Sequence, residues 1–261
     1  MTKVIAVAGK GGTGKTLVSA LLISYLTEQG RGPILAIDAD PSTNLDLTLG
    51  TSVDETVGEI REDTSEQVSS GTFNAGISKP EYLELRIHQA LVEESGYDLL
   101  AMGRPEGPGC YCAANSMLRL SIDRLSQAYR YVVIDNEAGL EHLSRRTTQN
   151  VDLLLIVSDP TIRGLATAER VTQLIEELKT EVGYIRLIVN RVPTDESGEP
   201  ALPPQLEEFI RDRSLELAGI IPMDPLVAEF DTLGRPLVQL PHESAARRAV
   251  EATFRSLDGL L

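Results

Sequence analysis

Apolar residues occur along the chain as short continuous runs separated by longer stretches with helical spacing. Continuous apolar runs bounded by glycine or polar residues are typical of strands buried on both faces of a parallel sheet. They occupy residues 3–9, 33–38, 97–103, 131–135, 151–159, 184–190 and 215–222. Helical spacing is found at residues 15–29, 113–128, 164–179 and 244–261. The alternation predicts an α/β fold with a doubly wound, mostly parallel sheet and helices on both faces, in one domain spanning residues 1–261.

The least regular part of the pattern lies between residues 50 and 96. Within it, residues 54–66 carry six acidic side chains and one basic side chain. They are Asp54, Glu55, Glu59, Glu62, Asp63 and Glu66, with Arg61. We interpret this segment as a solvated helix face, and the alternative is a surface on which a partner docks.

The formal net charge of −15 disfavours binding to nucleic acid or to an anionic membrane surface. No apolar run is long enough to cross a membrane, and the first residues do not form a secretory signal. The chain has only two cysteines, so it has no disulfide framework. These features predict a cytoplasmic protein.

A phosphate-binding motif lies between the first predicted strand and the first predicted helix. The stretch "GKGGTGKT" at residues 9–16 fits G-x-x-x-x-G-K-[ST] without a mismatch. Its glycines let backbone N–H groups converge on phosphate oxygens, the lysine reaches the β- and γ-phosphates, and the threonine hydroxyl binds Mg²⁺. The predicted nucleotide-binding residues are Gly11, Gly12, Thr13, Gly14, Lys15 and Thr16.

The loop also contains a second lysine, Lys10. With it, "KGGTGKT" at residues 10–16 resembles the deviant Walker A motif of the MinD/ParA-type dimeric ATPases. The resemblance implies that Lys10 reaches the nucleotide of a partner subunit and stabilises transition-state charge there. The alternative is a surface lysine that neutralises phosphate within its own subunit.

Carboxylates follow two of the predicted strands. By the same resemblance, Asp40 orients the attacking water and Asp38 binds Mg²⁺ through water, although both could also cap a helix or form a turn. Asp135 ends the strand at residues 131–135, where a carboxylate can hold Mg²⁺ through water. Lys10, Lys15 and Asp40 are the expected catalytic residues.

The same region departs from the family's pattern. Most relatives have proline two residues after the aspartate that corresponds to Asp135, whereas this chain has Glu137. This difference reduces the number of subfamilies to which the chain can belong. His142 could be a relay or a ligand, and we interpret it as a structural hydrogen-bond donor. In relatives, an asparagine at the position of Asn190, which precedes Arg191, and backbone near residues 220–224 hold the base. No N/T-K-x-D run is present, so ATP is the expected nucleotide.

Both cysteines, Cys110 and Cys112, lie in the stretch "GPGCYC" at residues 107–112. They could be free thiols, a strained disulfide or metal ligands. Thiolates select nickel, zinc or copper over hard cations. Two thiolates are half of a four-ligand site, which a two-fold symmetric dimer would complete. We therefore expect a homodimer that binds one transition metal ion.

The sequence "CYC" between a strand and a helix, together with "IDNEAGLEH" at residues 134–142, resembles the CooC-type ATPases. These are nickel-insertion or maturation factors of carbon monoxide dehydrogenase and, in close relatives, of acetyl-CoA synthase. The resemblance covers essentially the whole chain. It implies ATP-dependent delivery of Ni²⁺ to such a client enzyme, with Zn²⁺ as another possible occupant of the cysteine site.

Two other functions remain open. A MinD/ParA-type positioning ATPase would use DNA or a membrane, and the amphipathic tail at residues 247–261 could lie on lipid, although such a face more often packs on its own domain. An Mrp-type iron–sulfur carrier typically has a Cys-x-x-Cys motif later in the chain.

Overall fold

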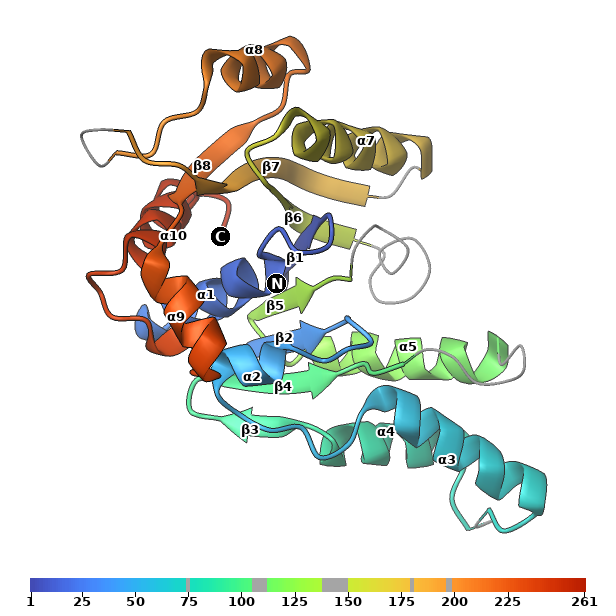
Figure 1. The fold of residues 1–261 in the computed structure, drawn as a ribbon. Coiled ribbons are helices and arrows are strands. Elements are labelled where there is room, and N and C mark those ends of the chain that lie inside the picture. Colours follow the sequence, from blue (N-terminus) through green and yellow to red (C-terminus); the bar gives the residue numbers. More distant parts are fainter. Residues whose placement is uncertain (74–75, 105–111, 138–149, 179–180, 196–198) are drawn as a thin grey trace.

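The protein is described by a computed structural model that covers residues 1–73, 76–104, 112–137, 150–178, 181–195 and 199–261 (Figure 1). Its described strands form an eight-stranded sheet. They are β1 (Lys3–Gly9), β2 (Ile34–Asp38), β3 (Val92–Glu94), β4 (Tyr97–Ala101), β5 (Tyr131–Asp135), β6 (Asn150–Ser158), β7 (Glu181–Val192) and β8 (Leu217–Pro222).

The strand order is β3-β4-β2-β5-β1-β6-β7-β8. Every neighbouring pair is parallel except β3 and β4, which are antiparallel. The predicted doubly wound sheet is therefore confirmed. The edge strand β3 was not predicted, because three residues with two glutamates carry no strand pattern.

Helices cover both faces of the sheet because successive side chains of each strand point to opposite sides. On β1, Ile5 and Val7 join one core with Leu22 and Phe254, whereas Ala6 packs in the other core. The α-helices of the described residues are α1 (Lys15–Glu28), α2 (Leu45–Leu49), α3 (Val57–Ser70), α4 (Lys79–Gln89), α5 (Cys112–Ser126), α7 (Ile162–Leu178), α8 (Pro204–Asp212), α9 (Pro225–Leu233) and α10 (Ala245–Ser256).

The carboxyl ends of the parallel strands all lie at one edge of this sheet. Ligands of doubly wound proteins bind at that edge, where the loops to the following helices meet. The phosphate-binding motif follows β1, Asp38 ends β2 and Asp135 ends β5, and these three strands are neighbours. The topology thus brings the predicted site residues together.

Most of the acidic segment, residues 57–66, lies in α3, in agreement with the helix interpretation, whereas residues 54–56 precede the helix. The helix begins with a capping box: the Thr56 side chain accepts a hydrogen bond from the Glu59 N–H, and the Glu59 carboxylate accepts one from the Thr56 N–H. This arrangement satisfies two backbone donors at the helix start. Glu59 therefore has a structural role.

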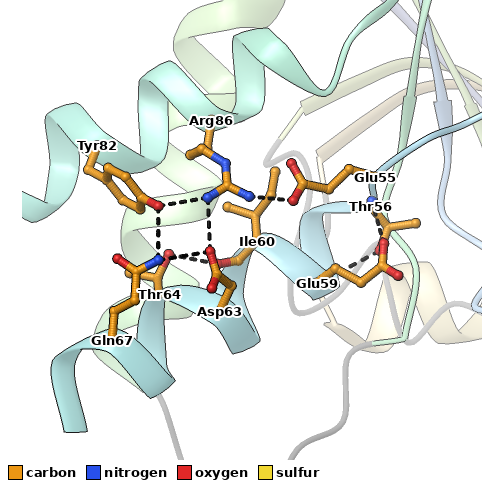
Figure 2. A network of polar contacts seen from close by, with 9 residues as sticks. All are labelled: Glu55, Thr56, Glu59, Ile60, Asp63, Thr64, Gln67, Tyr82 and Arg86. Atoms are coloured by element: carbon orange, nitrogen blue, oxygen red, sulfur yellow. Dashed lines mark hydrogen bonds and ion pairs between the residues drawn. The ribbon is translucent and has the colours of Figure 1, made fainter. Parts of the chain in front are cut away.

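Two further acids of this segment bind Arg86 on α4 (Figure 2). The guanidinium pairs with Glu55 and with Asp63, for which the Nη1–Oδ2 distance is 2.9 Å. It also donates to the Tyr82 hydroxyl at 2.7 Å. The network holds α3 against α4. With Glu59 in the capping box and Glu62 beside Arg61 at 3.6 Å, at least four of the six acidic side chains in residues 54–66 have partners within the fold.

The amphipathic tail packs on its own domain. Val250, Phe254 and Leu257 are buried in the core that also contains α1. The apolar face of the tail, which suggested that the tail could lie on lipid, therefore packs in the core of the domain. Within the described residues, no helix combines the length and the apolar character that crossing a membrane requires.

Candidate functional site

The phosphate loop connects the buried strand β1 to α1. Gly12 and Gly14 have φ values of 77° and 94°, which glycine adopts without steric cost. Thr13 is buried, and its hydroxyl donates to the Lys10 carbonyl at 2.9 Å, closing the loop. The sequence therefore sets the loop geometry through two left-handed glycines and one internal hydrogen bond.

Lys15, the first residue of α1, has a buried side chain. Its Nζ donates to the Lys10 carbonyl at 3.4 Å, and it forms no ion pair with any residue that the structure describes. A buried ammonium beside a helix N-terminus favours an anionic ligand. Lys10, in contrast, has an exposed side chain, which suits a contact outside its own subunit.

Asp135 and Asp38 lie side by side at the ends of β5 and β2, and both are 1% exposed. Burial raises the pKa of Asp135 to about 6 and the nearby Asp38 raises it too, whereas hydrogen bonds from Thr16 and Ser19 oppose the increase. Burial also raises the pKa of Asp38. Two buried carboxylates next to a threonine hydroxyl are a donor set that fits Mg²⁺.

Asp38 ends β2 and Asp40 lies in the loop that follows it, and we call this segment the first switch. These two aspartates differ in their surroundings. Asp38 accepts three backbone N–H groups: from Asp40 at 3.0 Å, from Asn44 at 2.9 Å and from Leu45 at 3.0 Å. It thereby fixes the loop that follows β2. Asp40 lines the nucleotide cavity and accepts only the Ser42 N–H, at 2.8 Å, among the described residues. Its other oxygen is available to bind a water molecule.

A cavity of about 690 Å³ lies beside this loop. This volume is in the range of small-molecule sites. Its lining includes Gly14, Lys15, Asp40, Glu137, Asn190, Arg191, Pro222 and Met223. Residues expected to hold phosphate, to support hydrolysis and to hold the base thus line one cavity, which fits a nucleoside triphosphate. Lys10, Asp38 and Asp135 are not among its lining residues.

Asn190 was expected to contact the base, and in the structure its side chain is hydrogen-bonded to the phosphate loop. Its Nδ2 donates to the Thr13 carbonyl at 2.8 Å, and its Oδ1 accepts the Arg191 N–H at 2.8 Å. The Arg191 guanidinium donates to the Gly12 carbonyl at 2.9 Å. The end of β7 is therefore bonded directly to the phosphate loop.

Sequence reasoning missed two supporting groups. Ser19, three residues after Thr16 on α1, donates to Asp135 at 2.9 Å, and its spacing on the helix was the available signal. Asp224 accepts the Ser244 hydroxyl at 2.6 Å and the Ala246 N–H at 3.0 Å, which joins the start of α9 to the start of α10. No local pattern predicts the bond between Asp224 and Ser244, because these residues are 20 positions apart in the sequence.

The remaining predicted residues lie at or beyond the described ranges. Cys112 is the first residue of α5, whereas Cys110 and His142 lie outside the described residues. The described part of the chain contains no group of three or more potential metal ligands from His, Cys, Asp and Glu. The metal site therefore stays a prediction.

Comparison with known proteins matches the nucleotide-binding domain described as CbiA, CobQ/CobB/MinD/ParA, over residues 4–237. An uncharacterized ATP-binding protein of Methanocaldococcus jannaschii is 45% identical, with 95% of each chain covered. The carbon monoxide dehydrogenase accessory protein CooC of Rhodospirillum rubrum is 33% identical, with 88% of this chain and 87% of CooC covered.

Among solved structures, the MinC:MinD cell division protein complex of Aquifex aeolicus matches with a TM-score of 0.72. The matched chain is 25% identical, and the match covers 99% of this chain and 96% of that one. The septum site-determining protein MinD of Pyrococcus horikoshii, whose structure is a complex with Mg-ADP, matches with a TM-score of 0.69 at 24% identity, covering 100% of this chain and 97% of that one. The chain belongs to the CobQ/CobB/MinD/ParA family of nucleotide-binding proteins and is a P-loop ATPase.

Proposed function

We propose that this ATPase delivers Ni²⁺ to a nickel- and iron–sulfur-containing client enzyme, either carbon monoxide dehydrogenase or acetyl-CoA synthase. The observation that carries the proposal is the pair Cys110 and Cys112 in a chain that is 33% identical to a carbon monoxide dehydrogenase accessory protein over most of its length. Thiolates bind nickel and zinc well and Mg²⁺ poorly, so this pair is separate in chemistry from the nucleotide site.

The position of the cysteines in the fold supports coupling to ATP. They follow β4, whose neighbour β2 ends at Asp38. The Met102 N–H, just after β4, donates to the Asp38 carbonyl at 2.8 Å. The segment that leads to the cysteines therefore begins beside the first switch, and a change at the switch would reach it directly.

Two cysteines per chain imply a shared site. A structural Zn²⁺ or a thiolate-bound Ni²⁺ takes four ligands, and one chain supplies two thiolates. A homodimer would supply all four around its two-fold axis. The resemblance of residues 10–16 to the deviant Walker A motif supports a dimer by a separate argument, because it implies that Lys10 acts on a partner's nucleotide. The exposure of Lys10 is compatible with that role.

The ATPase residues then divide the work of hydrolysis. Lys15 and Thr16 would hold the phosphates. The Thr16 hydroxyl, with Asp38 and Asp135 through water, would hold the Mg²⁺ ion, which supplies charge neutralisation when bound. Asp40 orients the attacking water through its available oxygen. Lys10 from the second subunit stabilises the charge that develops on the transferred phosphoryl group. Hydrolysis would end the dimeric state that holds the metal ion.

The test is a Ni²⁺ titration of reduced protein under anaerobic conditions, with and without Mg–ATP. The variant is Cys110→Ser/Cys112→Ser. A matched control, His88→Gln/His242→Gln, removes two exposed histidines of the described surface, whose imidazoles can also bind nickel. About one Ni²⁺ per two chains, lost in the cysteine variant and kept in the histidine variant, is expected. Nickel binding that does not depend on cysteine would refute the proposal.

The second candidate is a positioning ATPase, favoured by the MinD-type fold match. Its membrane form would need the tail to bind lipid, yet the apolar face of α10 is buried. Sedimentation with anionic liposomes and Mg–ATP distinguishes the two, using the variant Arg248→Glu/Arg255→Glu at exposed positions. Sedimentation that this variant abolishes would favour the positioning function. A cysteine-dependent iron–sulfur chromophore after reconstitution would instead favour the Mrp-type carrier.

A further inference from the structure

The carboxyl end of β7 reaches the phosphate loop although β6 lies between β7 and β1 in the sheet. Asn190 donates to the Thr13 carbonyl at 2.8 Å, and Arg191 donates to the Gly12 carbonyl at 2.9 Å. Two successive residues of one strand thus hold two successive carbonyl groups of the loop. Such paired contacts fix the orientation of the loop more firmly than either contact would alone.

The backbone at this point is shaped for the contact. Arg191 has φ 58°, a left-handed conformation that is uncommon for a residue with a Cβ and costs energy unless its surroundings hold it. The Asn190 Oδ1 holds it by accepting the Arg191 N–H at 2.8 Å. Asn190 is itself 2% exposed, so its amide is fixed in place.

The loop is complementary to this strand end. A Cβ built on Gly14 would lie 2.2 Å from the Asn190 Nδ2, so only glycine leaves room for the amide. The carbonyl and N–H groups of a trans peptide point in opposite directions. The bond from Asn190 to the Thr13 carbonyl therefore sets the direction of the Gly14 N–H, and Gly14 is one of the residues that line the cavity.

The geometry points to Asn190 and Arg191 as positioning residues that hold the phosphate loop in its phosphate-binding shape. Both residues also line the nucleotide cavity. A ligand that contacts Asn190 or Arg191 in the cavity would therefore also affect the shape of the phosphate loop, because both residues are bonded to it. The consequence is that these side chains contribute to binding of a ligand that has no base.

The experiment compares Mg–ATP with inorganic tripolyphosphate plus Mg²⁺, by calorimetry or by competition with a fluorescent nucleotide. The variants are Asn190→Ala and Arg191→Gly. Glycine accepts the left-handed backbone, so the second variant removes the guanidinium contact without adding strain. The control is Arg186→Ala on β7, whose guanidinium donates to the Ile185 carbonyl away from the loop.

Loss of one such hydrogen bond is expected to weaken tripolyphosphate binding about tenfold in each variant. ATP binding is expected to weaken by a similar factor. In steady-state kinetics KM rises more than kcat falls. Tripolyphosphate affinity that stays at the wild-type value in both variants, while ATP affinity falls, would overturn the proposal and leave these residues as base contacts only. If Asn190→Ala does not fold, Arg191→Gly at its exposed position still decides the question.

Discussion

The buried carboxylate of Asp135 makes the stability of the nucleotide-free protein depend on pH. Its ordinary pKa of 3.8 is raised to about 6, chiefly by burial. A raised pKa in the folded state means that the folded protein binds the proton more tightly than the unfolded chain does. The stabilisation is complete below the unfolded pKa and is lost as pH rises through the folded pKa.

The size of the effect follows from the difference between the two pKa values, which corresponds to about 3 kcal/mol in the free energy of unfolding. Roughly half of it is lost by pH 5 and the remainder by pH 7. Asp135→Asn cannot ionise and keeps a carbonyl oxygen that can accept from Ser19. We therefore expect wild type to lose about 2 kcal/mol more than this variant between pH 4 and pH 7, since a small part of the effect is already lost at pH 4.

Urea unfolding in EDTA, followed by circular dichroism at several pH values, measures the effect. Asp38 is present in both proteins, so the part of its raised pKa that comes from burial cancels in the difference. Ser19→Ala removes a hydrogen bond that lowers the pKa of Asp135, so the pKa should rise further. The loss of stability with increasing pH should then be larger than in wild type. Parallel stability profiles for wild type and Asp135→Asn would show that the carboxylate is not desolvated in the folded state, and the reasoning would fail.

Three further changes test other parts of the structure. Lys10→Ala should retain ATP binding and lose most turnover in a phosphate-release assay, and unchanged kcat would exclude action on a partner's nucleotide. Arg86→Met should lower the free energy of unfolding in urea by about 1–3 kcal/mol by leaving Glu55 and Asp63 without their cation, with ATPase activity retained. Lost activity would show that α3 and α4 act on the site. Phe254→Ala, at a fully buried position, should cost about 3–5 kcal/mol in the same assay, and a change below 1 kcal/mol would contradict the packing of α10.

The sheet was predictable because its strands are buried on both faces and read as continuous apolar runs. The same logic fails where burial is partial. The strand β3 contains Glu93 and Glu94, and its sequence resembles a loop. The helices α3 and α4 are stabilised by capping boxes and by Arg86, whose partners lie 23 and 31 residues away in the sequence. Ion pairs between residues so far apart in the sequence follow no periodic pattern, so the sequence alone does not predict them.

The site shows the same division between local and long-range information. The phosphate loop was predictable because its glycines, lysine and threonine act within eight consecutive residues. Asn190 was predicted only as a base contact, because its bond to Thr13 spans 177 residues and depends on the order of the strands. The sequence therefore specifies the loop twice: locally through Gly12 and Gly14, and at a distance through the strand end that holds its carbonyls. A loop fixed from both sides can present its N–H groups to phosphate without reorganising, which is the property that preorganised phosphate sites require.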